Sequence, residues 1–321
     1  MSYSRSQAVQ RSGEFSPLPS SFVTRIGYGR SVAQHGELFQ GQIEDFQMRR
    51  RRCLISLPCN CLYSTATFQP LIDDPVNVYP PHKEKARRVV ELTLRHCGAQ
   101  VRGGHLTIQS NIPEAKGYGS STADCVAASI STADALALSL TEDEIAMLVV
   151  QAELASDNFM FSRAVLFAHR EGVVLEDYAS CLPSLEVLGI DADSGSIVDT
   201  LQYPPAVYTW RQIQLFGTLT GALRRAIRSK DIQLLGRIAT ASAVVNQEFL
   251  PKPMFKEIAQ LAEQAGALGV AVAHSGTVMS VLMDPAHPDL SRRIEFFQVR
   301  LQALGVTHIM RFQTNGAHTK K

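Results

Sequence analysis

The segment PEAKGYGSST, residues 113–122, places two glycines, a lysine and three hydroxyl side chains just before a helix-like stretch. Gly117 and Gly119 permit positive φ and let backbone N–H groups approach a ligand closely. The first turn of a helix leaves N–H donors unpaired and carries the positive end of the helix dipole. Lys116 could add a positive charge, and the hydroxyl of Ser121 could bind phosphate or ligate magnesium. The pattern is therefore typical of a phosphate-binding loop.

An ordinary helix start would account for some of the same residues. Serine is a common N-cap, Ser121 with Asp124 resembles a cap, and Gly-X-Gly is frequent in turns. The segment is not a Walker A motif, because no Gly-Lys-Ser/Thr ends it, and it does not match the dinucleotide-binding fingerprint. Spacing alone leaves both interpretations open.

Composition limits the class of protein further. The chain has 321 residues, 45% of them hydrophobic and 19% charged, with a net charge of +1. This balance is that of an ordinary globular protein. With a net charge so close to zero, the overall electrostatic field does not favour nucleic acid or an anionic membrane as a partner. The basic run at residues 49–52 is typical of a solvated loop or hairpin, with a phosphate or nucleic-acid patch as the alternative.

The cysteines and the apolar runs exclude several other classes. Six cysteines in a chain of this length do not form a disulfide framework, and the pair Cys59 and Cys61 has no second pair at a zinc-like spacing. No run approaches the roughly 18 apolar residues that a membrane span needs, and the polar N-terminus lacks a secretory signal pattern. We expect a cytoplasmic protein that does not enter a membrane.

Periodicity predicts mixed helices and strands. Residues 1–25 are rich in Ser, Arg, Gln and Pro and predict a disordered arm. An apolar stripe from Val126 to Leu140 predicts a long helix after Ser121, and Thr141 with Glu144 forms a capping-box pattern for the next one. Further helices are expected at residues 83–96, 211–229, 231–249, 253–265 and 291–304. Strands are expected near residues 29–34, 53–57, 62–68, 105–110, 164–168, 172–176, 185–190, 270–274, 278–283 and 307–312.

These elements do not follow a strict βαβ repeat, so an α+β fold is favoured over a doubly wound sheet. A cluster of Asp, Ser, Gly and Pro near residues 191–210 suggests a boundary. We therefore divide the chain into the N-terminal arm (1–25), an N-terminal domain (26–195) and a C-terminal domain (196–321).

The loop also resembles the central motif of the GHMP kinases, the superfamily of galactokinase, homoserine kinase and mevalonate kinase. Other segments, in the same order between residues 28 and 312, resemble the L-threonine kinase branch, which makes O-phospho-L-threonine for the aminopropanol arm of cobalamin. They are residues 33–41 (AQHGELFQG), 56–65, 115–124, 247–253 (QEFLPKP) and 273–278 (AHSGTV). The resemblance implies a GHMP kinase fold, with an N-terminal ribosomal-protein-S5-domain-2-like half carrying the ATP-binding loop and a C-terminal ferredoxin-like half.

The resemblance also implies roles for individual residues. The nucleotide would contact Pro113, Lys116, Gly117, Tyr118, Gly119, Ser120, Ser121 and Thr122. The acceptor would lie near Glu37, His274, Ser275 and Gly276, where Glu37 could pair with a substrate ammonium group. Magnesium would be held by Ser121 and Glu153.

Asp157 is the expected catalytic base, because related kinases place an aspartate in this loop to accept the proton of the attacking hydroxyl. A carboxylate within hydrogen-bond reach of the hydroxyl can orient it and collect its proton. The alternative for Asp157 is a loop cap or turn residue. Glu153 departs from the family pattern, since the run Glu153-Leu-Ala-Ser-Asp157 is one residue longer and lacks a proline. A solvated glutamate at a helix end is the alternative for Glu153.

The resemblance thus implies an ATP- and Mg²⁺-dependent kinase that phosphorylates the side-chain hydroxyl of L-threonine in cobalamin biosynthesis. One alternative keeps the chemistry but takes another hydroxylated amino acid or a secondary-metabolite intermediate. Another alternative is a non-catalytic binding or regulatory protein with the same fold, because fold alone does not fix function. We expect a small-molecule substrate, and the sequence does not indicate an oligomeric state.

Overall fold

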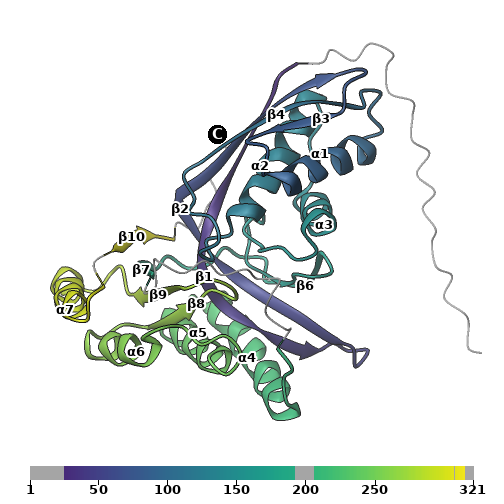
Figure 1. The fold of residues 1–321 in the computed structure, drawn as a ribbon. Helices are drawn as coiled ribbons and strands as arrows, with labels where there is room; N and C mark the ends of the chain where they lie inside the picture. Colours follow the sequence, from purple (N-terminus) through teal and green to yellow (C-terminus); the bar gives the residue numbers. More distant parts are fainter. Residues whose placement is uncertain (1–24, 192–205, 307, 315–321) are drawn as a thin grey trace, which may run out of the picture.

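The computed structural model describes residues 25–191, 206–306 and 308–314 (Figure 1). The predicted N-terminal arm, apart from Arg25, and the proposed domain boundary at residues 195 and 196 lie outside these ranges. The described chain is built on one ten-stranded sheet whose main path runs β10-β7-β9-β8-β1-β2-β4-β3. Helices pack against this sheet in both the N-terminal and the C-terminal part of the chain.

Two long antiparallel strands, β1 (Gly27–Glu44) and β2 (Arg50–Leu71), form the centre of the sheet. The turn between them is held by Asp45, whose Oδ1 accepts hydrogen bonds of 2.9 Å from the backbone N–H groups of Gln47 and Arg49. The basic run therefore belongs to a hairpin, and Arg51 pairs with Asp45 at 3.2 Å and also with Glu171.

The N-terminal part adds two strands and three helices to this centre. They are β3 (Val76–Tyr79), α1 (Glu84–His96), β4 (Gly103–Ser110), α2 (Ser120–Ala135) and α3 (Glu142–Glu153). The helix α2 lies directly on β1, since a Cβ atom at Gly27 or at Gly29 would stand 2.0 Å from a backbone oxygen of α2. Glycine at both positions is what allows this close approach.

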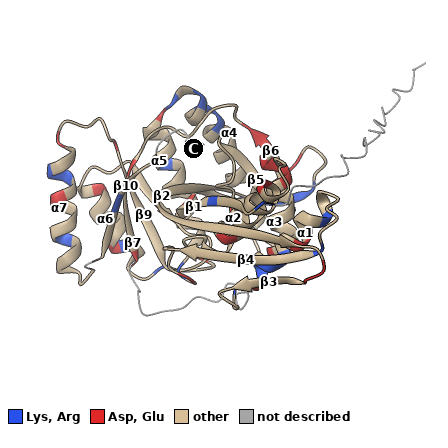
Figure 2. Cartoon of the chain, turned by 90° about the horizontal axis from the view of Figure 1, so that it is seen from above, with Lys and Arg blue, Asp and Glu red and all other residues tan. Residues whose placement is uncertain are grey.

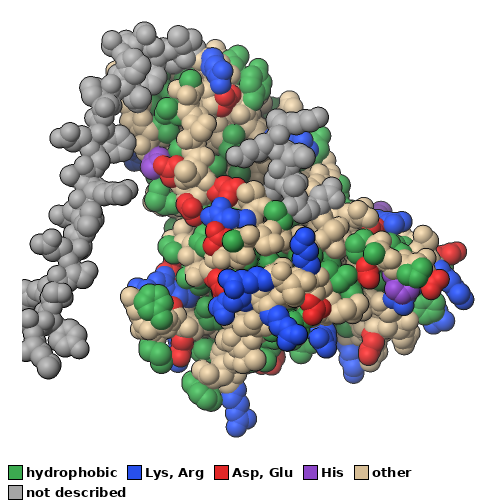
Figure 3. Space-filling model, turned by 180° about the vertical axis from the view of Figure 1, so that it is seen from behind, with side chains coloured by type: hydrophobic (Ala, Val, Ile, Leu, Met, Phe, Trp, Pro, Cys, Tyr) green, Lys and Arg blue, Asp and Glu red, His purple; other side chains and the backbone are tan. Residues whose placement is uncertain are grey.

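A short hairpin, β5 (Val165–Ala168) and β6 (Val173–Asp177), branches from β2. Figure 2 shows acidic residues of β6 beside basic residues of α4 (Trp210–Ser229), where Arg224 Nη2 donates to Glu176 Oε2 at 2.9 Å. On the face drawn in Figure 3, basic and acidic side chains are interspersed. No helix in the described part of the chain is long and apolar enough to cross a membrane.

The C-terminal part supplies the other half of the sheet and four helices. After β7 (Glu186–Asp191) come α4, α5 (Ile232–Asn246), α6 (Phe255–Gln264), β8 (Gly269–Val272), β9 (Val278–Met283), α7 (Leu290–Ala303) and β10 (Ile309–Gln313). The strand β7 pairs antiparallel with both β9 and β10, and β8 joins this set to β1 at the pair Val272 and Glu37.

The predicted α+β class is confirmed, and most of the expected elements are present. Three differences stand out. The helix α2 ends at Ala135 rather than Leu140, because Ala137 takes a left-handed conformation with φ of 56°. The strand β3 was not predicted. The strand β1 continues ten residues past the predicted end at Gln34. Polar side chains are buried along this stretch, so the sequence shows no regular alternation of apolar and polar residues there.

Candidate active site

The glycine-serine loop, residues 113–122, lies between β4 and α2, and its last residues form the first turn of α2. Gly119 is the N-cap of α2 with φ of 72°, a left-handed conformation that favours glycine. Glycine offers no side chain to cap the helix, and the first turn contains no acidic residue. The first N–H groups of α2 and the positive end of its dipole are therefore available to an anion.

The loop is fixed by backbone contact with the turn at residues 274–277. A Cβ at Gly117 would stand 2.3 Å from the carbonyl oxygen of Ser275, and one at Gly276 would stand 2.2 Å from that of Lys116. The N–H of Thr277 donates to the Lys116 carbonyl at 3.0 Å. Only glycine fits at these two positions, so the loop and the turn form one surface.

The proposed magnesium ligands are brought together at the C-terminal end of α3. The Ser121 hydroxyl donates to Glu153 Oε1, and Thr122 Oγ1 donates to Oε2 at 2.8 Å. Glu153 is 7% exposed, and burial raises its pKa although Lys85 Nζ lies 3.6 Å from Oε1. Glu153 is thus not a solvated helix-end residue. A buried carboxylate beside a hydroxyl is a donor set that fits Mg²⁺.

Asp157 lies beside Gly119, at the N-terminal end of α2. It is 4% exposed, and a Cβ at Gly119 would stand 2.6 Å from its Oδ2. Among the described residues no hydrogen-bond donor reaches its Oδ1. Burial raises the pKa of Asp157 to about 7; nearby His274 acts to lower it, and the charges of Glu37 and Glu153 raise it further. A carboxyl that titrates near neutrality is suited to accept a proton.

Glu37 on β1 and His274 after β8 complete a cluster with Asp157. His274 Nδ1 lies 3.3 Å from Glu37 Oε1 and 3.6 Å from Asp157 Oδ1. Burial acts to lower the pKa of His274, but the two carboxylates outweigh it and the pKa is raised. The three ligand atoms lie within 4.8 Å of one another. The two carboxylates favour the protonated form of His274, and that form does not ligate a metal, so charge pairing is the simpler interpretation of this cluster.

Lys252 lies beside this cluster and was not singled out by sequence analysis as a candidate site residue. It is 5% exposed, and its Nζ donates to the Gly276 carbonyl at 2.7 Å. Burial lowers its pKa to about 7, while the negative charge of Glu37 acts to raise it. Lys252 stands between two prolines in the segment QEFLPKP, which sequence analysis used only for the family resemblance. A lysine fixed between prolines was the available signal.

The structure gathers most of the predicted site residues, with some differences in role. Tyr118 is 7% exposed, and its ring packs edge-on against His35 with 5.0 Å between the ring centroids, so its side chain is part of the core. Asp124 does not cap α2 but accepts hydrogen bonds of 2.6 Å from Ser64 Oγ and Lys83 Nζ. Lys116 Nζ lies 4.0 Å from Asp191 Oδ2.

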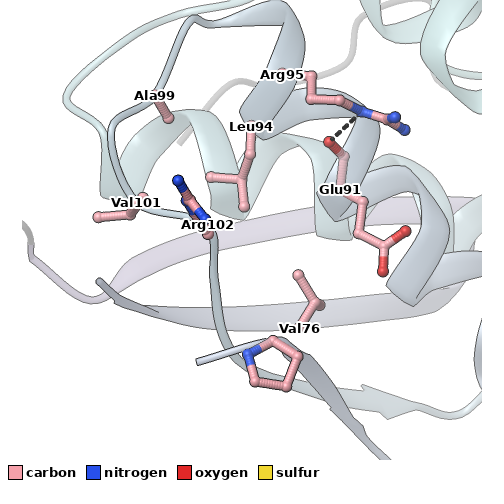
Figure 4. Close-up of a pocket in the computed structure, with 8 residues that line it drawn as sticks. Val76, Glu91, Leu94, Arg95, Ala99, Val101 and Arg102 are labelled. Carbon is pink, nitrogen blue, oxygen red and sulfur yellow. Dashed lines mark hydrogen bonds between the residues drawn. The ribbon is translucent and has the colours of Figure 1, made fainter. Parts of the chain in front are cut away.

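A cavity of about 400 Å³ lies elsewhere, beside α1 (Figure 4). Its walls include Val76, Leu94 and Val101, with Glu91 and Arg95 above them. None of its lining residues belongs to the glycine-serine loop, the Asp157 segment or the 274–277 turn. This cavity therefore does not mark the cluster described above.

Comparison with known proteins identifies the family. The profile described as "GHMP kinases N terminal domain" matches residues 84–162, and "GHMP kinases C terminal" matches residues 223–293. The chain is 30% identical over 276 residues to an L-threonine kinase of Salmonella typhimurium, covering 83% of this chain and 86% of that one. It is 29% identical over 308 residues to an L-threonine kinase of Citrobacter freundii, covering 88% and 96%.

Solved structures agree on the fold. The homoserine kinase from Cytophaga hutchinsonii superposes with a TM-score of 0.67 at 14% identity, covering 93% of this chain and 97% of that one. At this identity the likeness concerns the fold alone. Together with the sequence relatives, it shows that the chain belongs to the GHMP kinase family and is a phosphotransferase that acts on a hydroxyl group.

Proposed function

We propose that this protein transfers the γ-phosphoryl group of ATP to the side-chain hydroxyl of L-threonine, giving ADP and O-phospho-L-threonine. The observation that carries the chemistry is Asp157, a buried carboxylate at the N-terminal end of α2, one of whose oxygens has no hydrogen bond among the described residues and lies 3.6 Å from His274 Nδ1. The choice of L-threonine is supported by the two L-threonine kinases, which match most of the chain.

In the proposed step, the hydroxyl oxygen of the acceptor attacks the γ-phosphorus. The bond between the γ-phosphorus and the β–γ bridging oxygen breaks. ADP leaves with that oxygen, and the hydroxyl proton passes to Asp157. Such transfer passes through a loose transition state, so the protein acts mainly by positioning groups and neutralising charge. The N–H groups at the start of α2 would hold the phosphates, with Lys116 adding positive charge.

Ser121 and Glu153 would hold a magnesium ion, which neutralises phosphate charge when bound. We expect Glu153→Gln to raise the Mg²⁺ concentration required for half-maximal activity roughly 10- to 100-fold. Titration of Mg²⁺ at saturating ATP measures this shift. An unchanged requirement would remove Glu153 from the metal site.

The acceptor would lie between Glu37, Asp157 and the 274–277 turn. Glu37 is 1% exposed, and its Oε2 has no hydrogen-bond partner among the described residues. An ammonium group would satisfy it by a charge-assisted hydrogen bond. Lys252, whose Nζ donates to the Gly276 carbonyl of the same turn, would pair with an acceptor carboxylate, which would favour its protonated form. A zwitterionic amino acid therefore fits the charges of this cluster.

The test is ADP release with L-threonine, L-serine and L-homoserine supplied side by side, with mass spectrometry of the product. We expect L-threonine to give the highest kcat/KM. A clear preference for another hydroxylated amino acid would overturn the acceptor but keep the kinase chemistry. Use of the product in cobalamin synthesis is part of the proposal, and a cobalamin requirement in a deletion strain, relieved by O-phospho-L-threonine, would support it.

A further inference from the structure

Three sulfur atoms converge where β2 passes β10, outside the residues assigned to phosphoryl transfer. Cys59 Sγ lies 3.2 Å from Cys61 Sγ, and Met310 Sδ lies 3.2 Å from Cys61 Sγ and 3.8 Å from Cys59 Sγ. Met310 is on β10, and Figure 1 shows β10 lying beside β2. The fold therefore gathers two thiols and a thioether from positions about 250 residues apart in the sequence.

The local backbone explains the convergence. Cys59 and Cys61 are two residues apart, the spacing at which strand side chains share one face. The pairing of β1 with β2 is irregular here: Ala33 is opposite Cys59, whereas Val32 is opposite Tyr63. Three residues of β2 thus have no partner on β1, so this segment can adjust its side chains more freely than a regular ladder allows.

We propose that Cys59, Cys61 and Met310 bind one soft monovalent metal ion of the Cu(I) class. Thiolate and thioether ligands select soft ions, whereas carboxylate and carbonyl oxygens select Mg²⁺ and Ca²⁺. Structural Zn²⁺ takes four ligands, most often thiolates and imidazoles, and here three sulfurs meet, one of them a thioether. The donor set therefore favours a three-coordinate soft ion over zinc.

The distances are compatible with such a site. With metal–sulfur bonds of about 2.3 Å, three sulfurs around a trigonal ion stand roughly 4.0 Å apart. The observed separations of 3.2, 3.2 and 3.8 Å require each sulfur to move by less than an ångström, which side-chain rotation at the irregular segment can supply. Cys61 is exposed and offers an entry path, while Cys59 is buried and shields one side of the ion.

Binding would exchange protons for the metal without any change of oxidation state. Cu(I) would replace the two thiol protons, leaving two thiolates and the neutral thioether around a +1 ion. Affinity should therefore rise with pH, because each ion bound releases protons.

The experiment is an anaerobic titration of the reduced full-length protein with Cu(I), in competition with a chromophoric Cu(I) chelator. We expect one equivalent to bind, with affinity falling roughly 100-fold or more in Cys61→Ser and about 10-fold or more in Met310→Leu. Cys97→Ser and Cys181→Ser are matched controls, because both remove a free thiol outside the cluster, and they should bind as the wild type does.

Several results would overturn the proposal. Wild-type affinity no greater than that of Cys61→Ser would remove the site. If Met310→Leu bound Cu(I) as tightly as the wild type does, the site would be an ordinary dithiol without a thioether ligand. If the wild type bound Zn²⁺ as tightly as Cu(I), the assignment to a soft ion would be wrong. Cys61 is exposed and Met310 half-buried, so neither variant depends on refilling a deep core, and circular dichroism of each checks its fold. X-ray absorption of the loaded protein should report three sulfur neighbours.

Discussion

Two buried aspartates near the start of α2 differ in what surrounds them. Asp124 is 2% exposed, and each of its oxygens accepts a hydrogen bond of 2.6 Å, one from Ser64 and one from Lys83. Asp157 is 4% exposed, yet its Oδ1 has no hydrogen-bond partner among the described residues, and its pKa is raised to about 7. A buried carboxylate whose two oxygens both accept hydrogen bonds stabilises the fold, whereas a buried carboxyl that lacks a hydrogen bond and has a shifted pKa is a candidate for a functional role.

The largest effect we expect is on catalysis at Asp157. Asp157→Asn should lower kcat roughly 100- to 10,000-fold, because the amide cannot take the proton of the attacking hydroxyl. Binding of Mg·ATP, measured by calorimetry, should stay close to that of the wild type. Asp143→Asn, an exposed change on α3, is the matched control and should keep full activity. Equal rates in Asp157→Asn and the wild type would end the role of Asp157 as the base.

The next effect concerns stability at Asp124. Asp124→Asn should lower the free energy of unfolding by about 3 kcal/mol, since removal of one partner leaves the half-buried Lys83 without its main counter-charge. Urea unfolding followed by circular dichroism measures the change. Asp134→Asn is a control on the same helix. Because Asp134 is more exposed, this variant should lose about 1 kcal/mol or less of its free energy of unfolding. If Asp124→Asn lost no more stability than Asp134→Asn, the pair of Asp124 with Lys83 would contribute no more than an ordinary surface ion pair.

The pH dependence of the reaction tests whether Asp157, unlike Asp124, takes part in proton transfer. Because the pKa of Asp157 is about 7, its carboxyl is protonated and unable to accept a proton below that pH. We expect kcat/KM to fall about tenfold per pH unit below pH 7 and to level off above it. A profile that stays flat down to pH 5 would show that no group of the site titrates near neutrality.

The last effect is on stability, and its sign is opposite to that at Asp124. The pKa of Asp157 is raised from 3.8 to about 7, so the folded protein favours the neutral form and loses stability as the pH rises between these two values, with no further loss above them. Asp157→Asn removes this loss and should be more stable than the wild type at pH 8, by up to about 4 kcal/mol, and nearly equal to it at pH 4. A variant that is less stable at pH 8 would show that the carboxylate contributes to the fold.

The helices were the part of the fold most open to prediction. The capping box at Thr141 and Glu144 is present at the start of α3, where Glu144 N donates to Thr141 Oγ1 at 3.2 Å. The long strand β1 was only partly predicted because residues 33–41 are all buried, the polar His35, Glu37 and Gln40 among them, so this stretch shows no alternation of apolar and polar side chains. Buried polar residues within β1 thus kept periodicity from indicating its full length.

The site was predictable where its residues are close in sequence. The glycines of the loop, Ser121 and Glu153 came from local spacing and the family resemblance, and the structure brings the last two into contact. The pairing of Glu37 with His274 spans 237 residues, and that of Lys83 with Asp124 spans 41. No local pattern encodes such partners, so the difference between Asp124 and Asp157 emerges only from the fold.

The measurement that tests this account most directly is the titration of the Asp157 carboxyl itself. Infrared difference spectra of the wild type minus Asp157→Asn, recorded across pH in the absence of nucleotide, isolate the C=O band of its protonated form. We predict that this band is present at pH 5 and disappears with a midpoint near 7. A carboxyl already ionised at pH 5, close to its ordinary pKa of 3.8, would contradict the account.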